Sequence, residues 1–394
     1  MPRSDPASEV LELTRGLVAI DSVSPSLAPG APGEAAIAAF AADRLDAAGF
    51  AVRCVTPAAD PRRVSVIAVR DGPRQGATVV LNGHLDTVGV EGMDDPFTAR
   101  AEDDRLSGRG TSDMKGGVAG IIVAAGLLAA AGAPGRIIVT LVADEEDASL
   151  GAVAVIDDLI GEATRMDACL IAEPTWLDLA VAHRGYGVAV VEMEGRAAHS
   201  SQPGEGIDAL KPLGDLLVAV AGRDHELHGV PEHPLLAHGS LMTTVARGGT
   251  AAFTIAAHAE AVIERRTLPG ESPTAAYDDV RALVDAVVAG APGVRAHVRP
   301  KIARDAWEMD AAGPAAALAE ALAASLAATG APPRRVGAPY WMESALWQAA
   351  GVPTVVCGPA GGGLHAVDEW VDLTQLRRFP VALADAVGKF LEAS

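Results

Sequence analysis

The chain has 394 residues, of which 49% are hydrophobic and 4% aromatic, so Ala, Val and Leu must fill most of a core large enough for two domains. Its formal net charge of −20 at pH 7 opposes non-specific binding to nucleic acid or to an anionic membrane surface. Three widely spaced cysteines without a Cys-x-x-Cys pair, and a first segment without an apolar signal core, favour a soluble protein of the reducing cytoplasm.

Strand-like and helical stretches alternate over the first part of the chain. Helical patterns cover 7–20, 34–49, the stretch from 116, and 151–160, and strand-like runs cover 51–55, 64–69, 78–81, 137–142 and 168–172. This alternation predicts an α/β layer with a largely parallel sheet. The apolar stretch 116–133 is as long as a membrane span, but its richness in Gly and Ala and its lack of aromatic and basic flanks favour a buried helix.

The pattern of predicted strands and helices then changes, which indicates an inserted domain. Strand-like runs cover 181–194, 251–264 and 294–299, and helical patterns lie after 207 and at 272–289. Their antiparallel character fits a small α+β domain. The α/β texture then returns, with helices at 314–329 and 344–350, a strand at 354–357 and a closing helix from 373. We therefore expect an α/β domain made of 1–179 and 301–394, with an α+β domain at 180–300 inserted into it.

An acidic run from Asp144 to Asp147 ends the apolar strand that begins at 137. Four carboxylates at a strand terminus repel one another, which favours a cation beside them. Adjacent Glu145 and Glu146 also suit two tasks of metal-assisted amide hydrolysis, those of an oxygen ligand and of a proton carrier. A solvated acidic turn is the alternative, and only further ligands elsewhere in the chain decide against it.

Two other motifs offer ligand types near strand ends. His84 and Asp86 close the strand-like run at 78–81 and stand two residues apart, so both can point to one side and the carboxylate can orient the ring. A self-satisfied His–Asp pair is the alternative. Asp113 lies in a glycine-rich turn before a helix, where it can bridge two cations or serve as an ordinary N-cap.

Glu173 follows the strand 168–172, and His365 follows the glycine turn 361–363. The carboxyl ends of parallel strands meet at one edge of a sheet, where such folds place their sites. Five ligands without Cys suit two Zn²⁺ ions about 3.5–4 Å apart, with Co²⁺ or Mn²⁺ as substitutes. These ligands are His84, Asp113, Glu146, Glu173 and His365, with Asp113 shared.

The order of these motifs resembles one family. It is similar to the dinuclear zinc amidohydrolases and peptidases that include acetylornithine deacetylase, succinyl-diaminopimelate desuccinylase, aminoacylase and the glutamate carboxypeptidases. The resemblance spans about residues 80–372 and implies a zinc-peptidase-like catalytic domain with a mostly parallel central sheet, plus an inserted α+β lid and dimerisation domain. It rests on 83–88, 110–117, 144–146, 173–175, 198–203 and 265–271, and on His365 with Glu369.

The resemblance also implies a role for each ligand. One zinc is held by His84 and Glu173, the other by Glu146 and His365, and Asp113 bridges them. The family further has a non-proline cis peptide after the bridging aspartate, which predicts one at Asp113–Met114.

Catalytic roles follow in the same way. Asp86 would orient His84, and Glu145 would be the general base that takes a proton from the metal-bridging water and passes it to the leaving amine. His199 matches the lid histidine that reaches into the partner subunit's site and stabilises the tetrahedral oxyanion, which implies a homodimer. Arg266 matches the arginine that pairs with the substrate carboxylate.

The inserted domain departs from the family pattern at several positions. Phe253 stands where the family has an asparagine that helps to bind the substrate carboxylate, and Ala256 stands where it has a proline. Glu264 replaces the more usual aspartate. The zinc ligands are untouched by these changes, so we expect the chemistry to be retained while the site accepts a larger apolar group.

These expectations lead to a metal-dependent hydrolase that cleaves the amide of an N-acyl amino acid, similar to acetylornithine deacetylase, with no nucleic-acid or membrane partner. A dipeptidase or carboxypeptidase with the same site is the alternative, because no motif reports whether the leaving amine belongs to a second peptide unit. A pseudoenzyme of the same fold would need neither Glu145 nor His199, and both are present.

Overall fold

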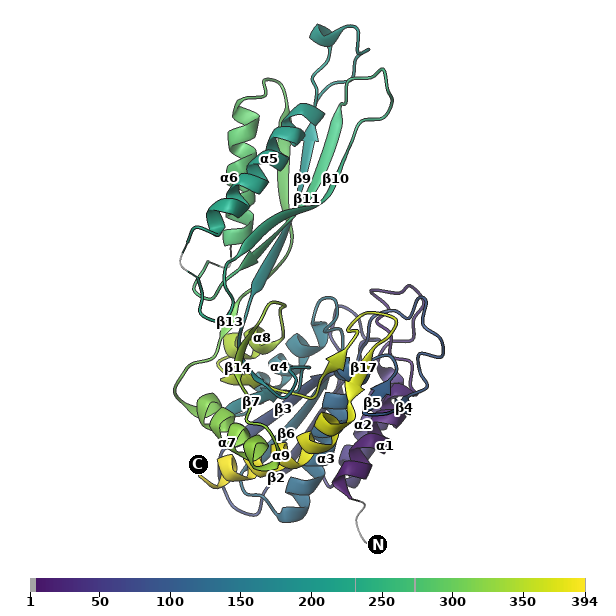
Figure 1. The fold of residues 1–394 in the computed structure, drawn as a ribbon, viewed down its shortest axis with the longest axis vertical. Helices are drawn as coiled ribbons and strands as arrows, with labels where there is room; N and C mark the ends of the chain where they lie inside the picture. Colours follow the sequence, from purple (N-terminus) through teal and green to yellow (C-terminus); the bar gives the residue numbers. More distant parts are fainter. Residues whose placement is uncertain (1–4, 231, 273, 394) are drawn as a thin grey trace. The chain divides into compact units, whose positions relative to one another are not determined.

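The computed structural model describes residues 5–230, 232–272 and 274–393, and the chain divides into two compact units (Figure 1). Unit 1 comprises Met1–Val181, Met309–Val336 and Leu346–Ser394, and unit 2 comprises Ala182–Glu308 and Gly337–Ala345. Unit 2 thus begins close to the expected start at 180, ends later than the expected 300, and includes a second segment that the 180–300 boundaries leave out.

A mixed sheet, most of whose strands belong to unit 1, has the strand order β1-β2-β6-β3-β7-β15-β8-β13, with β14 paired to β8. The neighbours β6, β3, β7 and β15 are parallel, whereas β1, β2, β8 and β13 join the sheet in antiparallel fashion. The predicted α/β class with parallel central strands is confirmed, and the antiparallel outer strands make the sheet mixed. The strands are β1 Ala51–Val55, β2 Ser65–Asp71, β3 Thr78–His84, β6 Arg136–Val142, β7 Ala168–Ile171, β8 Leu179–His183, β13 Trp307–Glu308, β14 Arg335–Ala338 and β15 Thr354–Val356.

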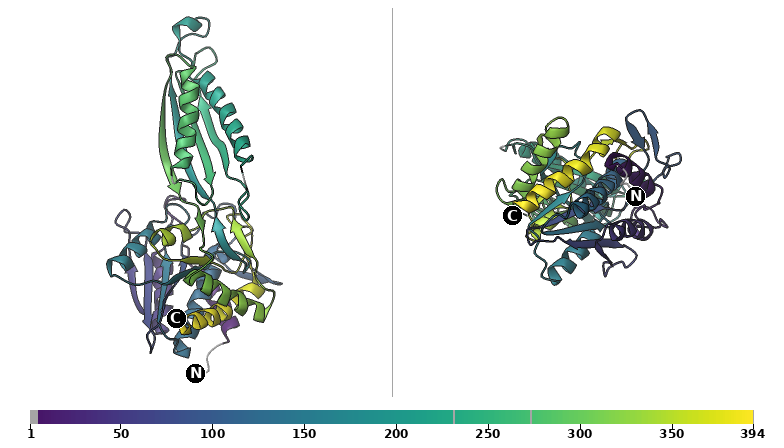
Figure 2. Two further views of the ribbon diagram at one scale, coloured as in Figure 1. Left: turned by 90° about the vertical axis from the view of Figure 1, so that its left-hand side faces the viewer. Right: turned by 90° about the horizontal axis from the view of Figure 1, so that it is seen from below.

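Helices cover this sheet. Helices α1, α3, α7 and α9 form one packed group, in which α3 also lies on β3 and β6, and α4 packs against β1, β2 and β6 (Figure 2). Among the described residues, Thr111–Ala131 is the one helical stretch long and apolar enough to cross a membrane, and 72% of its most apolar window is buried, as in a core helix. The helices are α1 Pro6–Val18, α2 Ala35–Ala47, α3 Gly116–Ala131, α4 Leu150–Gly161, α7 Pro314–Thr329, α8 Ser344–Ala349 and α9 Leu373–Glu392.

A small antiparallel sheet joins distant parts of unit 1. Its strands run in the order β16-β17-β5-β4, so the chain around 361–372 lies beside the chain that leads into the turn of Asp113. Gly117 allows α3 to approach the end of β7, because a Cβ there would lie 2.2 Å from the carbonyl oxygen of Ala172. The strands are β4 Arg100–Glu102, β5 Arg105–Ser107, β16 Gly361–Gly362 and β17 Trp370–Asp372.

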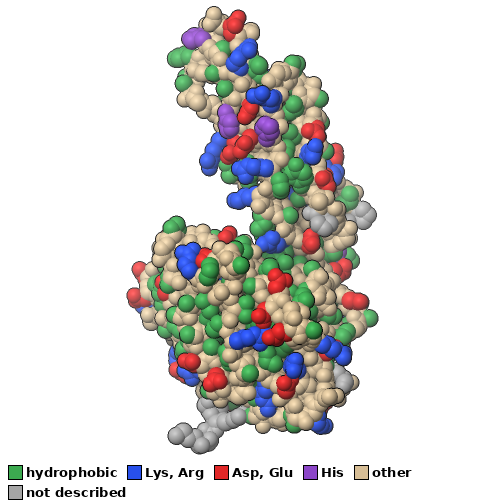
Figure 3. Space-filling view, turned by 180° about the vertical axis from the view of Figure 1, so that it is seen from behind, with side chains coloured by type: hydrophobic (Ala, Val, Ile, Leu, Met, Phe, Trp, Pro, Cys, Tyr) green, Lys and Arg blue, Asp and Glu red, His purple; other side chains and the backbone are tan. Residues whose placement is uncertain are grey.

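Unit 2 contains an antiparallel sheet of order β10-β11-β9-β12, with α5 and α6 on one face. Burial alternates along β11, because every second side chain joins a core with α5 and α6. On the other face Arg295 pairs with Glu194 and Arg299 with Glu192, and Figure 3 shows acidic and basic side chains interspersed on one side of unit 2. The elements are β9 Gly185–Glu194, β10 Ser240–Gly248, β11 His258–Thr267, β12 Arg295–Arg304, α5 Leu210–Leu227 and α6 Ala275–Ala289.

Two expected strands of this region need correction. The strand-like run 181–194 contains two strands, because the chain leaves the central sheet at the end of β8 and enters the sheet of unit 2 at β9. The run 251–264 becomes a strand only from His258. The sequence pattern also missed β10, an edge strand in which a bulge between Thr243 and Val245 interrupts the alternation.

Candidate metal centre and active site

Three parallel strands carry candidate ligands to one edge of the central sheet. His84 is the last residue of β3, the acidic pair Glu145 and Glu146 follows β6, and Glu173 follows β7. Because β3 lies between β6 and β7, these strand ends are neighbours. Asp113 is supplied by the turn Thr111–Lys115 before α3, and its peptide bond to Met114 is cis, as expected.

Asp113 lies between the two histidines. Its Oδ1 is 2.9 Å from Nε2 of His84, and its Oδ2 is 3.4 Å from Nε2 of His365. Each imidazole has a second carboxylate at hand: Oε1 of Glu173 is 4.0 Å from Nε2 of His84, and Oε2 of Glu146 is 3.0 Å from Nε2 of His365. The arrangement has the grouping that the resemblance implies, with one shared carboxylate and one imidazole and one carboxylate on each side.

Glu145 belongs to the same cluster. Its carboxylate, His84 and Glu173 offer ligand atoms that lie within 4.8 Å of one another, and His84, Asp113 and Glu146 form a second such group. Glu145 is half-buried, whereas Asp147 in the same acidic run is exposed. Within the acidic run Asp144–Asp147, Glu145 and Glu146 are therefore the residues whose carboxylates join the group of candidate ligands.

The tautomer of His84 follows from its hydrogen bonds. Nδ1 lies 3.0 Å from the backbone carbonyl oxygen of Asp86, which can only accept, so Nδ1 carries the proton. In the neutral ring the lone pair is then on Nε2, the atom that faces Asp113. The Asp86 carboxylate, expected to orient this ring, is 3.7 Å from Nδ1 and accepts instead from the backbone amides of Glu145 and Glu146.

The electrostatics of the cluster favour cations. Hydrogen bonds to Asp113 and Glu146 raise the pKa of His365 to about 10. Burial opposes a charge on His84, but Asp113 and the nearby glutamates raise its pKa well above the usual value. Burial likewise opposes ionisation of Asp113, yet the two histidines hold its pKa far below the usual range. A field that draws protons onto two imidazoles also attracts metal cations.

The donor set fits two divalent metal ions. It consists of imidazole nitrogens and carboxylate oxygens, the ligands that Zn²⁺ takes where no thiolate is present. Oε1 of Glu146 is buried and has no hydrogen-bond partner among the described residues. A buried carboxylate oxygen without a donor is costly unless a cation or another donor faces it. Glu146 therefore carries independent structural evidence of a ligand at this place.

The match to a protein-family model identifies the family of this chain and its chemistry. The model described as peptidase family M20/M25/M40 matches residues 80–389. The chain belongs to this family. It is therefore a hydrolytic enzyme that acts on amides.

Two relatives of this M20 enzyme match nearly its whole length. It is 29% identical over 386 residues to the acetylornithine deacetylase of Myxococcus xanthus, which covers 95% of each chain. It is also 29% identical over 385 residues to the succinyl-diaminopimelate desuccinylase of Dinoroseobacter shibae, which covers 94% of this chain and 96% of that one.

Solved structures share the fold. A tripeptidase from Staphylococcus aureus has a TM-score of 0.80 at 16% identity and covers 98% of this chain and 99% of its own. A dinuclear metal-binding peptidase of the M20 family from Bacillus subtilis has a TM-score of 0.75 at 16% identity and covers 99% of each chain.

Glu369 holds the turn that carries Asp113 in this M20 enzyme. Its Oε1 accepts from the amides of Ser112 and Asp113, at 3.0 and 3.1 Å. Its Oε2 accepts from the amide of Gly110 at 2.8 Å and from Nη1 of Arg109 at 2.7 Å. The sequence pattern around Glu369 indicates no role for it, because its hydrogen bond to Arg109 spans 260 positions.

The candidate residues of unit 2 lie at its surface. His199 is exposed, and its Nδ1 accepts from the backbone amide of Ser201 at 3.2 Å, which leaves the proton of the neutral ring on Nε2. Phe253 is 72% exposed and joins the same local structure, because its carbonyl oxygen accepts from the amide of Ser200. Arg266 donates through Nε to Glu264 at 2.6 Å and stacks over the ring of Tyr186.

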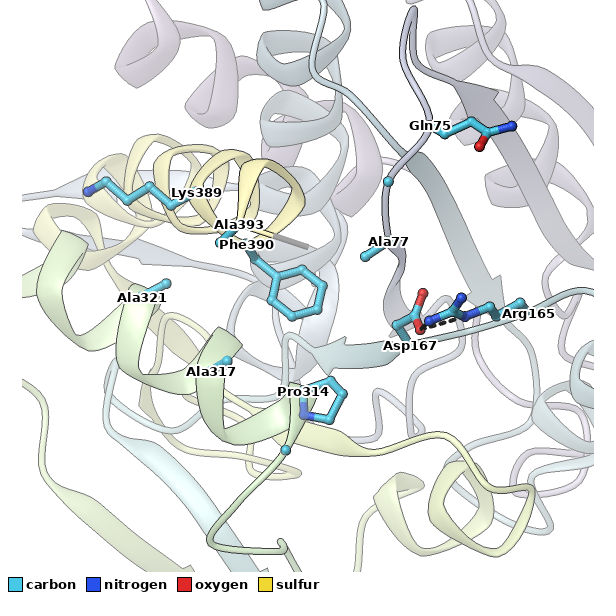
Figure 4. A pocket seen from close by; sticks show the side chains of 12 residues that line it. Gln75, Ala77, Arg165, Asp167, Pro314, Ala317, Ala321, Lys389, Phe390 and Ala393 are labelled. Atoms are coloured by element: carbon cyan, nitrogen blue, oxygen red, sulfur yellow. Dashed lines mark hydrogen bonds and ion pairs between the residues drawn. The ribbon is translucent and has the colours of Figure 1, made fainter.

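A cavity of about 880 Å³ in unit 1 lies away from the metal cluster (Figure 4). Ala77 and Asp167 line it and immediately precede β3 and β7, so it opens at the amino ends of these strands. His84 is the last residue of β3 and Glu173 follows β7, so both lie at the carboxyl ends of the same strands. The cavity is lined by Ala317 and Phe390 and flanked by the paired Arg165 and Asp167, and it does not belong to the cluster.

Proposed function

We propose that this M20 enzyme is a cytoplasmic, zinc-dependent deacylase that hydrolyses the amide of an N-acyl amino acid and works as a homodimer. The observation that carries the proposal is Asp113, whose two carboxylate oxygens face two imidazoles while Glu145 lies beside them. The full-length match to an acetylornithine deacetylase supports the substrate class.

The ligands divide into two sets in this proposal. Asp113 would be common to both sets, because its two carboxylate oxygens face different imidazoles. Each set also contains one imidazole and one glutamate, and Co²⁺ or Mn²⁺ can replace zinc at either. The first set is His84 with Glu173, and the second is His365 with Glu146.

Glu145 acts as the general base. A pair of divalent cations, when bound, lowers the pKa of water towards about 7 and polarises the amide carbonyl. Glu145 takes a proton from the attacking water while the water oxygen bonds to the carbonyl carbon. It then gives that proton to the amide nitrogen as the carbon–nitrogen bond breaks, which releases a carboxylic acid and a free amine, and the acid loses its proton to the amine or to solvent. Asp86 keeps Glu145 in place, because its carboxylate accepts a hydrogen bond from the backbone amide of Glu145.

Unit 2 contributes substrate recognition and oxyanion stabilisation in this proposal. The Nε2–H of His199 donates to the oxygen that becomes negative in the tetrahedral intermediate, in the partner subunit's site. Arg266 binds the substrate carboxylate. A guanidinium that Glu264 fixes at Nε still presents its Nη donors for this purpose. Phe253 contacts the acyl group or the side chain and favours apolar ones.

A dipeptidase or carboxypeptidase activity is the second candidate. It is favoured by the fold likeness to a tripeptidase and to a metallo-carboxypeptidase of the same family. The same ligands and the same base would serve it, because only the leaving amine differs. The two candidates therefore differ in the substrate that is turned over.

The test is hydrolysis of a panel of N-acetyl, N-succinyl and N-aromatic-acyl amino acids and dipeptides by the zinc-reconstituted protein. We expect turnover of one acyl class, and we expect Glu145→Gln to lower kcat at least about 10³-fold because the amide cannot accept the proton. Asp147→Asn, an exposed neighbour in the same run, is the matched control and should leave kcat unchanged. Turnover of dipeptides alone would favour the peptidase, and no turnover with two metals bound would reject both.

A further inference from the structure

A buried guanidinium lies behind the acidic run. Arg63 lies two residues before the start of β2, and only 1% of its side chain is exposed. Its Nε and Nη2 donate to the carboxylate of Glu34 at 2.5–3.0 Å, and Ser24 and Ser26 accept from Nη2 and Nη1 at 3.2 and 2.9 Å. The whole fork is thus engaged, as a buried arginine requires.

One end of the fork faces Asp86. Nη2 of Arg63 is 3.7 Å from Oδ2 of this carboxylate, which is fully buried. The two oxygens of Asp86 accept from the backbone amides of Glu145 and Glu146 at 3.1 and 3.2 Å. The proposed base Glu145 and the proposed ligand Glu146 are therefore both held through their backbone amides by the carboxylate of Asp86, which lies beside Arg63.

The other end of the fork binds Asp144, the residue before Glu145. Nη1 of Arg63 is 2.7 Å from Oδ1 of Asp144, and Oδ2 of Asp144 accepts from the amide of Leu150 at 3.2 Å. Asp144 has a φ of +67°, a left-handed conformation that residues with a Cβ adopt only at a cost. The ion pair with Arg63 and the hydrogen bond from the amide of Leu150 together hold the chain in this turn. The turn directs Glu145 towards the cluster.

The charges explain why an arginine is needed. Glu34, Asp86 and Asp144 are all buried, and burial raises the pKa of Glu34 to about 7 and also raises that of Asp144. One cation has to face three carboxylates that lie in different directions. A planar guanidinium with five donors does this, whereas an ammonium group on the same stem is a point charge and reaches fewer of them.

We propose that Arg63 is a positioning residue that fixes Glu145 and Glu146 by holding Asp86 and Asp144 at the same time. The roles of Glu145 and Glu146 rest on the proposed function, whereas the contacts of Arg63 do not depend on it. No motif marks Arg63 in the sequence, where it lies in a polar stretch that resembles an ordinary turn.

The test compares Arg63→Lys with the wild type and with Arg53→Lys. Arg53 on β1 pairs with Asp158 in a half-exposed ion pair of the same unit and provides the matched control. We expect Arg63→Lys to lower kcat about 10- to 100-fold with KM changed less than about threefold, because loss of outer contacts misplaces the base and a ligand without touching the substrate. The control should change neither.

Two readouts do not depend on turnover. Titration of the metal-free proteins with Co²⁺ should show weaker binding in Arg63→Lys by about 10- to 100-fold, and the visible spectrum of the Co²⁺ form should change because Glu146 moves. Should the lysine variant fail to fold, Asp144→Asn removes one arm of the network alone and should act in the same direction. Unchanged kcat, Co²⁺ affinity and spectrum with only a lower melting temperature would overturn the proposal. A wild type without amide turnover would reject the proposed function, while the Co²⁺ data would still decide about Arg63.

Discussion

The two units of the molecule differ in how they hold their functional side chains. In unit 1 the candidate ligands other than His365, which is 53% exposed, are buried or nearly so, and buried carboxylates hold parts of the site: Glu369 binds the turn of Asp113, and Asp86 binds the backbone of Glu145. In unit 2 the candidates His199 and Phe253 lie at the surface, where hydrogen bonds join His199 to Ser201 and Phe253 to Ser200. Under the proposed function, unit 1 holds the metal ligands and the base, and unit 2 contributes an oxyanion donor and substrate recognition.

The difference determines what a substitution costs in each unit. A change at Asp113 or Glu369 would leave buried donors or charges without partners, which costs several kcal/mol. A change at Phe253 leaves nothing buried unsatisfied, because the side chain is 72% exposed. Departures from the family pattern can therefore collect in unit 2 without loss of the fold.

The largest change in kcat that tests this difference between the units is expected for a substitution of His199. If unit 2 supplies an oxyanion donor, His199→Ala should lower kcat about 10²- to 10³-fold with a small effect on KM. His258→Ala, another exposed histidine of unit 2, is the control and should leave kcat unchanged. Unaltered kcat in His199→Ala would show that unit 1 suffices for catalysis.

Subunit mixing sharpens the same prediction. In a two-fold dimer with His199 acting across subunits, Glu145→Gln and His199→Ala are both inactive alone, but a mixed dimer has one complete site. An equimolar mixture after subunit exchange should therefore regain about a quarter of the wild-type activity. A mixture as inactive as its components would place His199 in its own subunit's site or exclude it from catalysis.

Stability against pH should distinguish the units next. His183 of unit 2 is fully buried beside Trp307 and Trp341, and burial lowers its pKa to about 4. Below pH 6.5 the unfolded chain binds a proton that the folded unit does not, so the free energy of unfolding should fall by up to about 1.4 kcal/mol per pH unit down to about pH 4. The contribution is fully present above pH 6.5.

Denaturant unfolding followed by tryptophan fluorescence at several pH values measures this effect. His183→Asn should flatten the pH dependence between pH 6.5 and 4, because the titrating group is gone while the side chain can still donate to the carbonyl oxygen of Arg184. His297→Gln, at an exposed position on β12, should keep the slope of the wild type. An equal slope in His183→Asn would assign the acid sensitivity to other groups.

The smallest expected effect concerns substrate choice at Phe253. Phe253→Asn should lower kcat/KM for N-aromatic-acyl amino acids about tenfold relative to N-acetyl ones, because an apolar contact is lost while the base and the ligands remain. Val153→Asn, at an exposed apolar position on α4 in unit 1, should not change this ratio. An unchanged ratio in Phe253→Asn would separate this residue from specificity.

Much of unit 1 could be predicted from the sequence. Apolar runs of strand length between helical patterns located β3, β6 and β7, and a ligand type follows each of them. Unit 2 was less accessible, because β10 is an edge strand with a bulge and because the single run 181–194 supplies strands to two different sheets. Periodicity describes which face is buried, not the sheet that a strand joins.

By itself, the sequence determined the α/β class, the identity of the candidate ligands and the base, and the family, because these depend on local patterns and on residue types at fixed spacing. Only the tertiary structure decided that the Asp86 carboxylate binds the amides of Glu145 and Glu146 and not the ring of His84. It alone showed Arg63 and Glu369 as supports of the site. Ion pairs and hydrogen bonds between residues 81 to 260 positions apart arise from packing, and no local pattern encodes such pairs.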